Sequence, residues 1–383
     1  MHKPINTFPG YHYISAADSD DGKPHNMYRG VDVGFGGYVY AEPGMYTNVA
    51  LLDVANMHGA SIVALNLLGE YTQRYSDLRV VRNSIKHGDF ETPKTLFEGK
   101  LTPYLQDKTQ AESLSAALKL PLNQLYGITS ASFENPARDS RNVNNIVALR
   151  GALFMKTLQD EIVSRGFDVV HCKTDSCKVP NATPEIIEFI KEFGRKYDYE
   201  FEHEATYDRM CLVNDAVYIA KYDDQGIRNK GGKKAGKWTA TGTQFQIPYV
   251  FKTLFSKEPI IFEDMCETKS VTSALYLDMN EDNPEEHNYI FVGKVGQFCP
   301  IKKGCGGGLL VREKDGKYNS ATGAKGYRWL ESELVKNLHK EGDIDISYYN
   351  RLVDEAVASI SEFGDFEWFT SDWYFKKGEN NGK

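Results

Sequence analysis

The stretch HCKTDSCKV, residues 171 to 179, decides the predicted fold. The apolar run FDVV that precedes it breaks at Lys173-Thr174-Asp175-Ser176, and the apolar pattern resumes as CKV, which predicts two short strands joined by a tight turn. Asp175 then lies at the tip of a β-hairpin, which holds its carboxylate rigidly and leaves the oxygens open. Hard divalent cations such as Mg²⁺ prefer ligands of this kind.

A second candidate carboxylate lies upstream, in NVALLDVANMHGASI, residues 48 to 62. The apolar strand VALLD ends at Asp53, and small and polar residues that can begin a helix follow it. One aspartate rarely holds a catalytic Mg²⁺ alone, so we expect Asp53 and Asp175 to form one site. Each has a structural alternative, because Asp53 can cap the following helix and Asp175 can serve the turn.

Length and composition are typical of a soluble globular protein. A chain of 383 residues, with 41% hydrophobic and 26% charged residues, can bury a sizeable core and divide into two or three domains. No apolar run approaches the roughly 18 residues of a membrane span, and the start MHKPINTFPG has no apolar signal core, so we expect no membrane partner and a cytoplasmic location. The six cysteines include no CxxC pair, so reduced thiols are expected rather than a zinc site.

The net charge of −8 argues against a protein coated in basic residues for nucleic acid, but two glycine-rich stretches are basic. Residues 221 to 237 carry six Lys or Arg against two Asp, and residues 294 to 328 carry eight against two acidic residues. Lysine and arginine on such loops can neutralise phosphates, and glycine lets the backbone approach a polyanion closely. Solvated basic loops are the alternative.

The periodicity predicts the order of elements along the chain. The polar residues 1 to 30 are expected to form an irregular arm, and residues 31 to 44 a strand that Gly34, Gly36 and Gly37 interrupt at a bulge or at a close approach of another backbone. Beyond Asp53, the predicted helices cover about residues 60 to 71, 71 to 87, 108 to 131 (kinked at Pro121), 141 to 165 and 184 to 197, and the predicted strands residues 199 to 206 and 211 to 222. From residue 246 a mixture of helix and loop is expected, which ends in a helix from residue 346.

This order of strand, helices, hairpin, helix and strand is that of the β-α-β-β-α-β motif, whose central strands lie side by side. It can therefore bring the two aspartates onto neighbouring strands. The helices of residues 71 to 131 form an insertion after the first strand. On the first of them Arg82 and Lys86 share a face, and on the second Lys119, Asn123 and Tyr126 do. The alternative to a binding site is that Arg82, Lys86 and Lys119 lie on solvated helix faces and that Tyr126 is a core residue.

Three of these segments, DVANMHGASI, KLPLNQLYG and KTDS, resemble in order and spacing motifs A, B and C of the family B DNA polymerases. The resemblance extends to GFGGYV ahead of motif A and to the helix that carries Arg82 and Lys86. More weakly, GKWTATGTQF, residues 236 to 245, resembles the region that leads into the thumb in this family. Roughly residues 31 to 250 are covered.

The resemblance implies an α+β fold with a ferredoxin-like β-α-β-β-α-β palm, an inserted two-helix fingers domain and a mixed, mainly helical thumb. The implied boundaries are an N-terminal arm at residues 1 to 30, the palm at 31 to 70 and 132 to 245, the fingers at 71 to 131 and the thumb at 246 to 383.

The implied activity is that of a template-directed DNA polymerase, which adds deoxynucleotides to a primer 3′-hydroxyl on primer-template DNA with two Mg²⁺ ions, for which Mn²⁺ can substitute. Asp53 and Asp175 would be catalytic and would bind the metals together with the backbone carbonyl of Val54. The implied dNTP-binding residues are Arg82, Lys86, Lys119, Asn123, Tyr126 and His58. The implied DNA-binding residues are Lys233, Lys234, Lys237, Thr241, Lys302 and Lys303.

The sequence also departs from the family pattern. Lys173 replaces the first carboxylate of the family's Asp-Thr-Asp, and Asn56-Met57-His58-Gly59 replaces Ser-Leu-Tyr-Pro, which puts His58 where an aromatic ring packs under the incoming sugar. Because only 52 residues precede Asp53, we expect no editing exonuclease in this chain. The resemblance is therefore to the polymerase half of a split, phage-type enzyme, located in the host cytoplasm if viral, with a separate exonuclease or N-terminal polymerase subunit and a processivity factor as partners.

Two other functions remain open at this point. Lys173 favours a catalytically inactive polymerase fold that acts as a DNA-binding scaffold. A metal-dependent nuclease could use the same two carboxylates, although it would not need a cationic face for a triphosphate.

Overall fold

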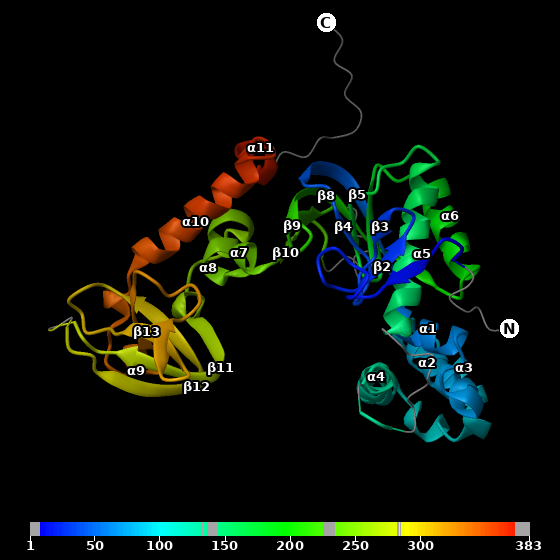
Figure 1. The fold of residues 1–383 in the computed structure, drawn as a ribbon, viewed down its shortest axis with the longest axis horizontal. Helices are drawn as coiled ribbons and strands as arrows, with labels where there is room; N and C mark the ends of the chain where they lie inside the picture. The colour runs from blue at the N-terminus through cyan, green and yellow to red at the C-terminus, as the bar shows by residue number, and fades with distance from the viewer. Residues whose placement is uncertain are drawn as a thin grey trace, which may run out of the picture. The chain divides into compact units, whose positions relative to one another are not determined.

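The computed structural model describes residues 8–131, 133–135, 145–224, 234–281, 283 and 285–371. The protein is a mixed α+β structure with antiparallel sheets, and it divides into two compact units (Figure 1). Unit 1 comprises Met1–Arg209 and Tyr222–Gly236, and unit 2 comprises Met210–Lys221 and Lys237–Lys383.

Unit 1 contains five neighbouring strands of a seven-stranded sheet, in the order β8-β5-β7-β6-β4. These strands are β4 (Val39–Ala41), β5 (Gly44–Val54), β6 (His171–Lys173), β7 (Ser176–Pro180) and β8 (Phe201–Asn214). Strand β5 pairs with β7 in antiparallel register, with Asp53 opposite Ser176. The apolar residues 49 to 52 are buried, and they lead directly to Asp53 at the end of the strand.

Two helices pack against this sheet, α5 (Ile146–Val163) and α6 (Pro184–Arg195) (Figure 1). One core cluster joins them to the strands, with Leu52 and Cys177 from the sheet, Phe154 and Leu158 from α5 and Ile190 from α6. Helix α5 is apolar around most of its circumference because it is buried on most sides. The helix expected from residue 141 begins at Ile146 in the described part of the chain.

The glycine-rich stretch before β4 runs beside the hairpin turn between β6 and β7. The Thr174 N–H donates to the Tyr38 carbonyl at 2.9 Å, and a Cβ at Gly37 would lie 2.9 Å from the Thr174 side chain. Gly37 also has a φ of 135°, which side chains rarely adopt. The close approach predicted from these glycines is therefore confirmed.

Three further helices of unit 1 follow β5 in the sequence: α1 (Met57–Ala64), α2 (Thr72–Lys86) and α4 (Lys108–Thr129). Helix α2 packs on α4, and Ile62, Tyr75 and Leu122 belong to one apolar cluster. Helix α4 is continuous through Pro121. Shorter elements connect these helices: η2 (Gly69–Tyr71), α3 (Thr92–Thr95), η3 (Phe97–Gly99) and η4 (Thr102–Tyr104).

The N-terminal segment is more ordered than expected. It contains a small sheet with the order β1-β2-β3, formed by β1 (His12–Ile14), β2 (His25–Tyr28) and β3 (Val31–Asp32). Polar contacts hold it together, since the His25 imidazole lies 2.7 Å from Asp32 and 2.9 Å from Asp21. Strands this short, held by polar side chains, leave no hydrophobic alternation to detect in the sequence.

Unit 2 contains a five-stranded sheet with the order β14-β13-β11-β12-β15. The expectation of a mainly helical region after residue 246 is therefore wrong. In this sheet, strands β11 and β12 carry β-branched and aromatic residues. The alternation of apolar and polar residues along β11 is obscured because the register shifts between Ser270 and Leu275. The strands of unit 2 are β9 (Val217–Tyr222), β10 (Trp238–Thr241), β11 (Glu267–Asp278), β12 (Tyr289–Ile301), β13 (Leu309–Lys314), β14 (Lys317–Ser320) and β15 (Arg328–Glu331).

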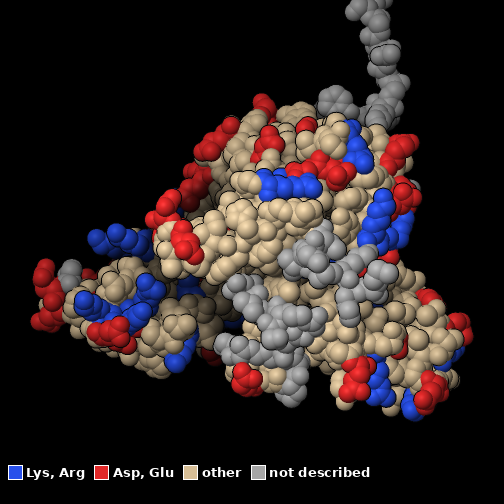
Figure 2. Space-filling model, turned by 45° about the vertical axis from the view of Figure 1, so that its right-hand side comes forward, with Lys and Arg blue, Asp and Glu red and all other residues tan. Residues whose placement is uncertain are grey.

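The longest helix of unit 2, α10 (Ile346–Ser361), packs Tyr348 and Tyr349 into the same core as Trp329 of β15. The shorter helices are α7 (Thr243–Gln246), α8 (Pro248–Phe251), η5 (Lys252–Ser256), η6 (Phe262–Met265), α9 (Ser332–Asn337), η7 (Glu341–Asp343) and α11 (Phe366–Thr370). None of the helices in the described ranges has both the length and the apolar character that crossing a membrane requires. On the face in Figure 2, basic and acidic side chains are interspersed rather than separated into a single basic surface.

Candidate active site

The two predicted carboxylates lie on neighbouring strands of unit 1. Asp53 occupies the penultimate position of β5, and Asp175 lies in the turn between β6 and β7. The Val54 N–H donates to the Asp175 carbonyl at 2.8 Å, which ties the tip of the hairpin to the end of β5. Both side chains are half-buried. The hairpin and the end of the strand therefore present two carboxylates in one place.

The surroundings of this pair are strongly anionic. Burial raises the pKa of Asp53 to about 8, and the charge of Asp175 acts in the same direction. Two further carboxylates, Glu204 and Glu202 of β8, also raise the pKa of Asp53, whereas Lys86 lowers it. Burial likewise raises the pKa of Asp175, with a contribution from Glu204. Negative charge at this point is thus undercompensated by the protein itself.

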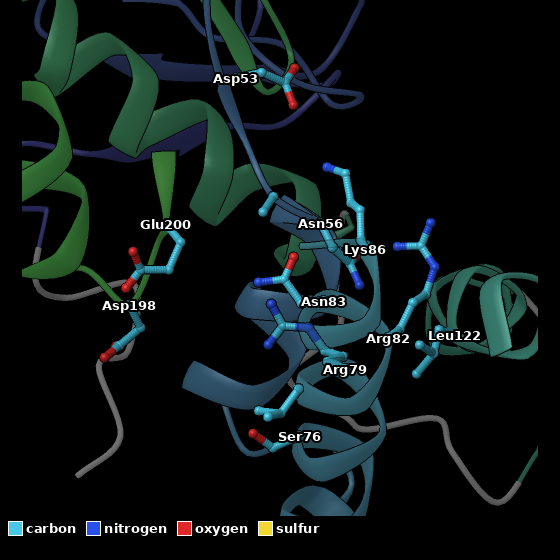
Figure 3. A pocket seen from close by; sticks show the side chains of 12 residues that line it. Asp53, Asn56, Ser76, Arg79, Arg82, Asn83, Lys86, Leu122, Asp198 and Glu200 are labelled. Carbon is cyan, nitrogen blue, oxygen red and sulfur yellow. The ribbon is translucent and has the colours of Figure 1, made fainter. Parts of the chain in front are cut away.

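Two pockets adjoin the carboxylates. The α2 pocket, of about 270 Å³, is lined by Asp53, Ala55, Asn56, Ser76, Arg79, Val80, Arg82, Asn83, Lys86, Leu122, Asp198 and Glu200 (Figure 3). The α4 pocket, of about 380 Å³, is lined by Asn56, Met57, His58, Arg82, Leu122, Asn123, Tyr126 and Asp175. They share Asn56, Arg82 and Leu122, so each aspartate opens onto a space that the same arginine borders.

Helix α2 supplies the cations of the α2 pocket. Arg79, Arg82 and Lys86 lie on one face, at the three- and four-residue spacing of a helix. The Lys86 side chain points toward Asp53 in Figure 3, and its Nζ pairs with Glu202 at 2.9 Å. In the described part of the chain, neither Arg79 nor Arg82 has a hydrogen-bond or ion-pair partner, and the Nε atoms of both are buried.

A stack of two rings forms one wall of the α4 pocket. The His58 and Tyr126 rings are 4.1 Å apart and nearly parallel, at 9°. The Tyr126 hydroxyl accepts a hydrogen bond from the Asn145 side chain at 2.9 Å. His58 Nδ1 is buried without a partner among the described residues, and burial lowers the pKa of the imidazole. A neutral, flat ring therefore faces this pocket.

Several other predicted residues lie elsewhere. Lys119 is exposed on α4 and lines neither pocket, and Lys173, at the end of β6, lines neither as well. Val54 lies beside Asp53 at the end of β5. Asn123 lines the α4 pocket as expected.

The predicted DNA-binding residues divide between the units. Lys233 lies outside the described residues, and Lys234 of unit 1 donates to the Tyr222 hydroxyl at 3.1 Å. In unit 2, Lys237 is exposed, Thr241 ends β10, and Lys302 donates to the Gly342 carbonyl at 2.7 Å.

Lys303 lines a pocket of about 780 Å³ within unit 2. Three basic residues that the sequence analysis did not single out, Lys325, Arg328 and Arg351, line the same pocket, with Tyr327 between the first two in sequence. Arg328 donates a hydrogen bond to the Gly307 carbonyl, and Arg351 donates one to the Glu355 carboxylate. Lys303, Lys325 and Arg351 are exposed, and Arg351 is paired with Glu355.

The structure also reveals site residues in unit 1 that the sequence analysis missed. Arg79 precedes Arg82 by three residues, so helical spacing could have found it. Glu202 and Glu204 alternate along β8, which puts them on one face of the sheet. Neither glutamate lies in a recognisable motif, and only the pairing of distant strands brings them near Asp53.

The donor set at the carboxylates is consistent with a magnesium site. Hard divalent cations prefer carboxylate oxygens, and a cation here would compensate the charge that raises the pKa of Asp53. Within the described ranges, no group of three or more His, Cys, Asp or Glu side chains is arranged to hold a metal ion. A magnesium ion here would have Asp53 and Asp175 as its carboxylate ligands, and any other ligands would be substrate or water oxygens.

Comparison with known proteins found similar solved structures, but no model of a known protein family and no curated protein matches the chain. Among solved structures, it is similar to that of the family B DNA polymerase from the hyperthermophilic archaeon Pyrobaculum calidifontis, with 13% identity and a TM-score of 0.46. The similarity covers 84% of this chain and 46% of that polymerase, so the chain matches less than half of its length.

Proposed function

We propose that this protein is a template-directed DNA polymerase, in which unit 1 carries the palm and fingers and the region after residue 246 belongs to a thumb. One observation carries the proposal. Residues predicted from three separate motifs, and from the helix that precedes the second of them, line two adjoining pockets that share one arginine: Asp53, His58, Arg82, Lys86, Asn123, Tyr126 and Asp175. A set of unrelated caps, turns and solvated faces would have no reason to converge in this way.

The reaction forms a bond between the primer 3′ oxygen and the α-phosphorus of a dNTP. The bond from that phosphorus to the bridging oxygen of the β-phosphate breaks, pyrophosphate leaves, and the hydroxyl proton passes to solvent. Two magnesium ions, when bound, would activate the attacking oxygen and stabilise the leaving group. Asp53 and Asp175 would hold them, and the tie from Val54 to Asp175 keeps the two carboxylates in register.

The remaining residues bind and orient the nucleotide. Arg82 borders both pockets, so its guanidinium can contact the triphosphate while the base and sugar occupy the α4 pocket. The His58–Tyr126 stack offers an apolar, flat surface to the sugar and base, and Asn123 supplies a polar group beside it. Mn²⁺ is expected to substitute for Mg²⁺, because both accept carboxylate oxygens.

Primer extension on a defined template, with each dNTP withheld in turn, tests the proposal. Asp53→Asn and Asp175→Asn should nearly eliminate extension and leave primer-template binding, measured by fluorescence anisotropy, largely intact, because that affinity comes from basic residues elsewhere. If either variant kept more than a few per cent of the activity, the substituted aspartate would not be a catalytic residue. A wild-type protein that binds DNA and extends nothing would favour the inactive scaffold, for which Lys173 at the hairpin is the motivating residue.

A further inference from the structure

The α2 pocket extends beyond the groups that the proposed reaction uses. One end holds Asp53 and Lys86, and the other holds Ser76 and Arg79, seven residues earlier on α2 (Figure 3). Seven residues correspond to about 10 Å along a helix axis. The pocket is thus longer than contact between one phosphate and the carboxylates requires.

Arg79 is the unusual group at the far end. Its side chain is half-buried and its Nε is enclosed, yet no described residue forms a hydrogen bond or an ion pair with it. Burial lowers the pKa of the guanidinium. A desolvated cation without a counter-charge is costly to a folded protein, so an anion from outside is the partner that would offset the cost.

The position of Arg79 is also fixed from the opposite side. A Cβ at Gly59 would lie 2.8 Å from Arg79 Nε, so the guanidinium packs against the first turn of α1 where only a glycine leaves room. Asn56, the residue that caps α1, accepts the Gly59 N–H at 3.1 Å and holds that turn in place. The arginine is therefore held in position before any ligand binds.

The facing wall limits how tightly an anion would be retained. Asp198 and Glu200 line the pocket opposite α2 (Figure 3). Asp198 lies 3.7 Å from the buried Arg150, which offsets its charge. Glu200 remains as an acidic side chain on this wall, which suits an anion that must bind briefly and leave.

We propose that Arg79, with Ser76 and Asn83 beside it, holds the pyrophosphate released by the reaction as it moves away from Asp53 along α2. This inference rests on the proposed function and adds to it a product-binding position that uses Arg79 together with Arg82, which also contacts the incoming nucleotide in that proposal. Arg79 and Arg82 together provide unpaired guanidinium groups for the two phosphates, and guanidinium binds phosphate oxygens bidentately.

Pyrophosphate binding to the wild type and to Arg79→Gln, measured by isothermal titration calorimetry in EDTA, is the first test. The variant should bind about tenfold or more weakly, because one charge-assisted contact is lost. Arg74→Gln is the matched control, since Arg74 is exposed on the same helix and lines neither pocket. Arg79→Gln removes a desolvated charge, so its thermal unfolding temperature should be no lower than that of the wild type.

The second test uses primer extension. The pyrophosphate concentration that halves extension should rise in Arg79→Gln, with a smaller rise in the KM for dNTPs, because Arg79 lines the α2 pocket and not the α4 pocket proposed for the base and sugar. Equal pyrophosphate affinity in the wild type and Arg79→Gln, or an equal rise in the KM for dNTPs, would overturn the inference and leave the polymerase proposal standing. If no extension occurs and pyrophosphate binding still depends on Arg79, the polymerase proposal fails and the anion site remains.

Discussion

At the scale of single residues, the most consequential group is the Asp53 carboxyl, because its environment opposes its charge. Burial and the neighbouring carboxylates raise its pKa from 3.8 to about 8. Between about pH 4 and pH 8, the folded metal-free protein keeps a proton that the unfolded chain has lost. This group therefore favours folding at low pH, and its contribution declines as the pH rises through that window.

We expect Asp53→Asn to stabilise the metal-free protein at pH 8 and to have little effect near pH 4. Thermal unfolding in EDTA at a series of pH values measures this, with Asp20→Asn at an exposed turn as the control. Mg²⁺ should raise the unfolding temperature of the wild type more than that of the variant, because a ligand that binds only the folded state stabilises it. A variant less stable than the wild type at pH 8 would show that the carboxylate is compensated by the protein.

His58 is the second residue with a specific consequence. Its ring stacks on Tyr126 beside the space proposed for the sugar, where it would sterically exclude a ribose 2′-hydroxyl. His58→Gly should therefore incorporate ribonucleotides more readily, and His58→Phe, which keeps a flat ring, should not. Competition between ribo- and deoxynucleotides in single-nucleotide extension measures the ratio. An unchanged ratio in the glycine variant would locate sugar selection elsewhere.

At the scale of elements, α2 and α4 were both predicted, but their contributions to the site differ. Helical spacing placed Arg82 and Lys86 on one face and Lys119, Asn123 and Tyr126 on another, and the structure has helices at both places. Spacing cannot tell how far along a helix a pocket extends. The α4 pocket reaches Asn123 and Tyr126 but not Lys119, which lies one turn earlier on the same helix and is exposed.

This difference yields a prediction for the two cations. Arg82→Ala should raise the KM for dNTPs by about tenfold or more, since it removes a charge-assisted contact from both pockets. Lys119→Ala should have a much smaller effect. Steady-state single-nucleotide kinetics measure both, and the circular dichroism of each variant checks that the helices persist. A larger loss from Lys119→Ala would mean that α4 rotates or moves when the nucleotide binds.

Strands were harder to predict than helices. The strand that ends at Asp53 and the hairpin at Asp175 were correct, because each is a compact apolar run with a clear end. The sheet of unit 2 was missed, since two glycines and a lysine in β12 and the register shift in β11 disrupt the period of two. Glu202 and Glu204 were missed for another reason: only the pairing of strands remote in sequence brings them to the site.

At the scale of the whole molecule, the distribution of charge means that a polymerase of this sequence would bind nucleic acid through local basic groups. The net charge is −8, and acidic and basic side chains are interspersed on the face in Figure 2. One pocket of unit 2 is lined by four basic residues, Lys303, Lys325, Arg328 and Arg351. Affinity for a phosphate backbone is expected to depend on such groups and on salt.

Lys303→Gln should accordingly weaken primer-template binding to a similar degree for all sequences. The slope of log K against log salt should become shallower by about one if Lys303 contacts one phosphate. Fluorescence anisotropy at several salt concentrations measures the slope, and Lys317→Gln, on β14 outside the pocket, is the control. Equal slopes for Lys303→Gln and the wild type would exclude this pocket from DNA binding.

The hairpin that presents Asp175 also contains two cysteines whose reactivity would report on its opening. Cys172 and Cys177 lie opposite each other across β6 and β7, and both thiols are buried. Burial raises the pKa of Cys172 and raises that of Cys177 to about 12, so neither forms a reactive thiolate while the strands stay paired. Pulsed alkylation read by mass spectrometry should therefore modify these two thiols only when the hairpin transiently opens, and later than the half-buried Cys266 and Cys305. The labelling rate would time the opening of the element that carries the carboxylate, and early labelling of Cys172 or Cys177 would show that the hairpin is loose in solution.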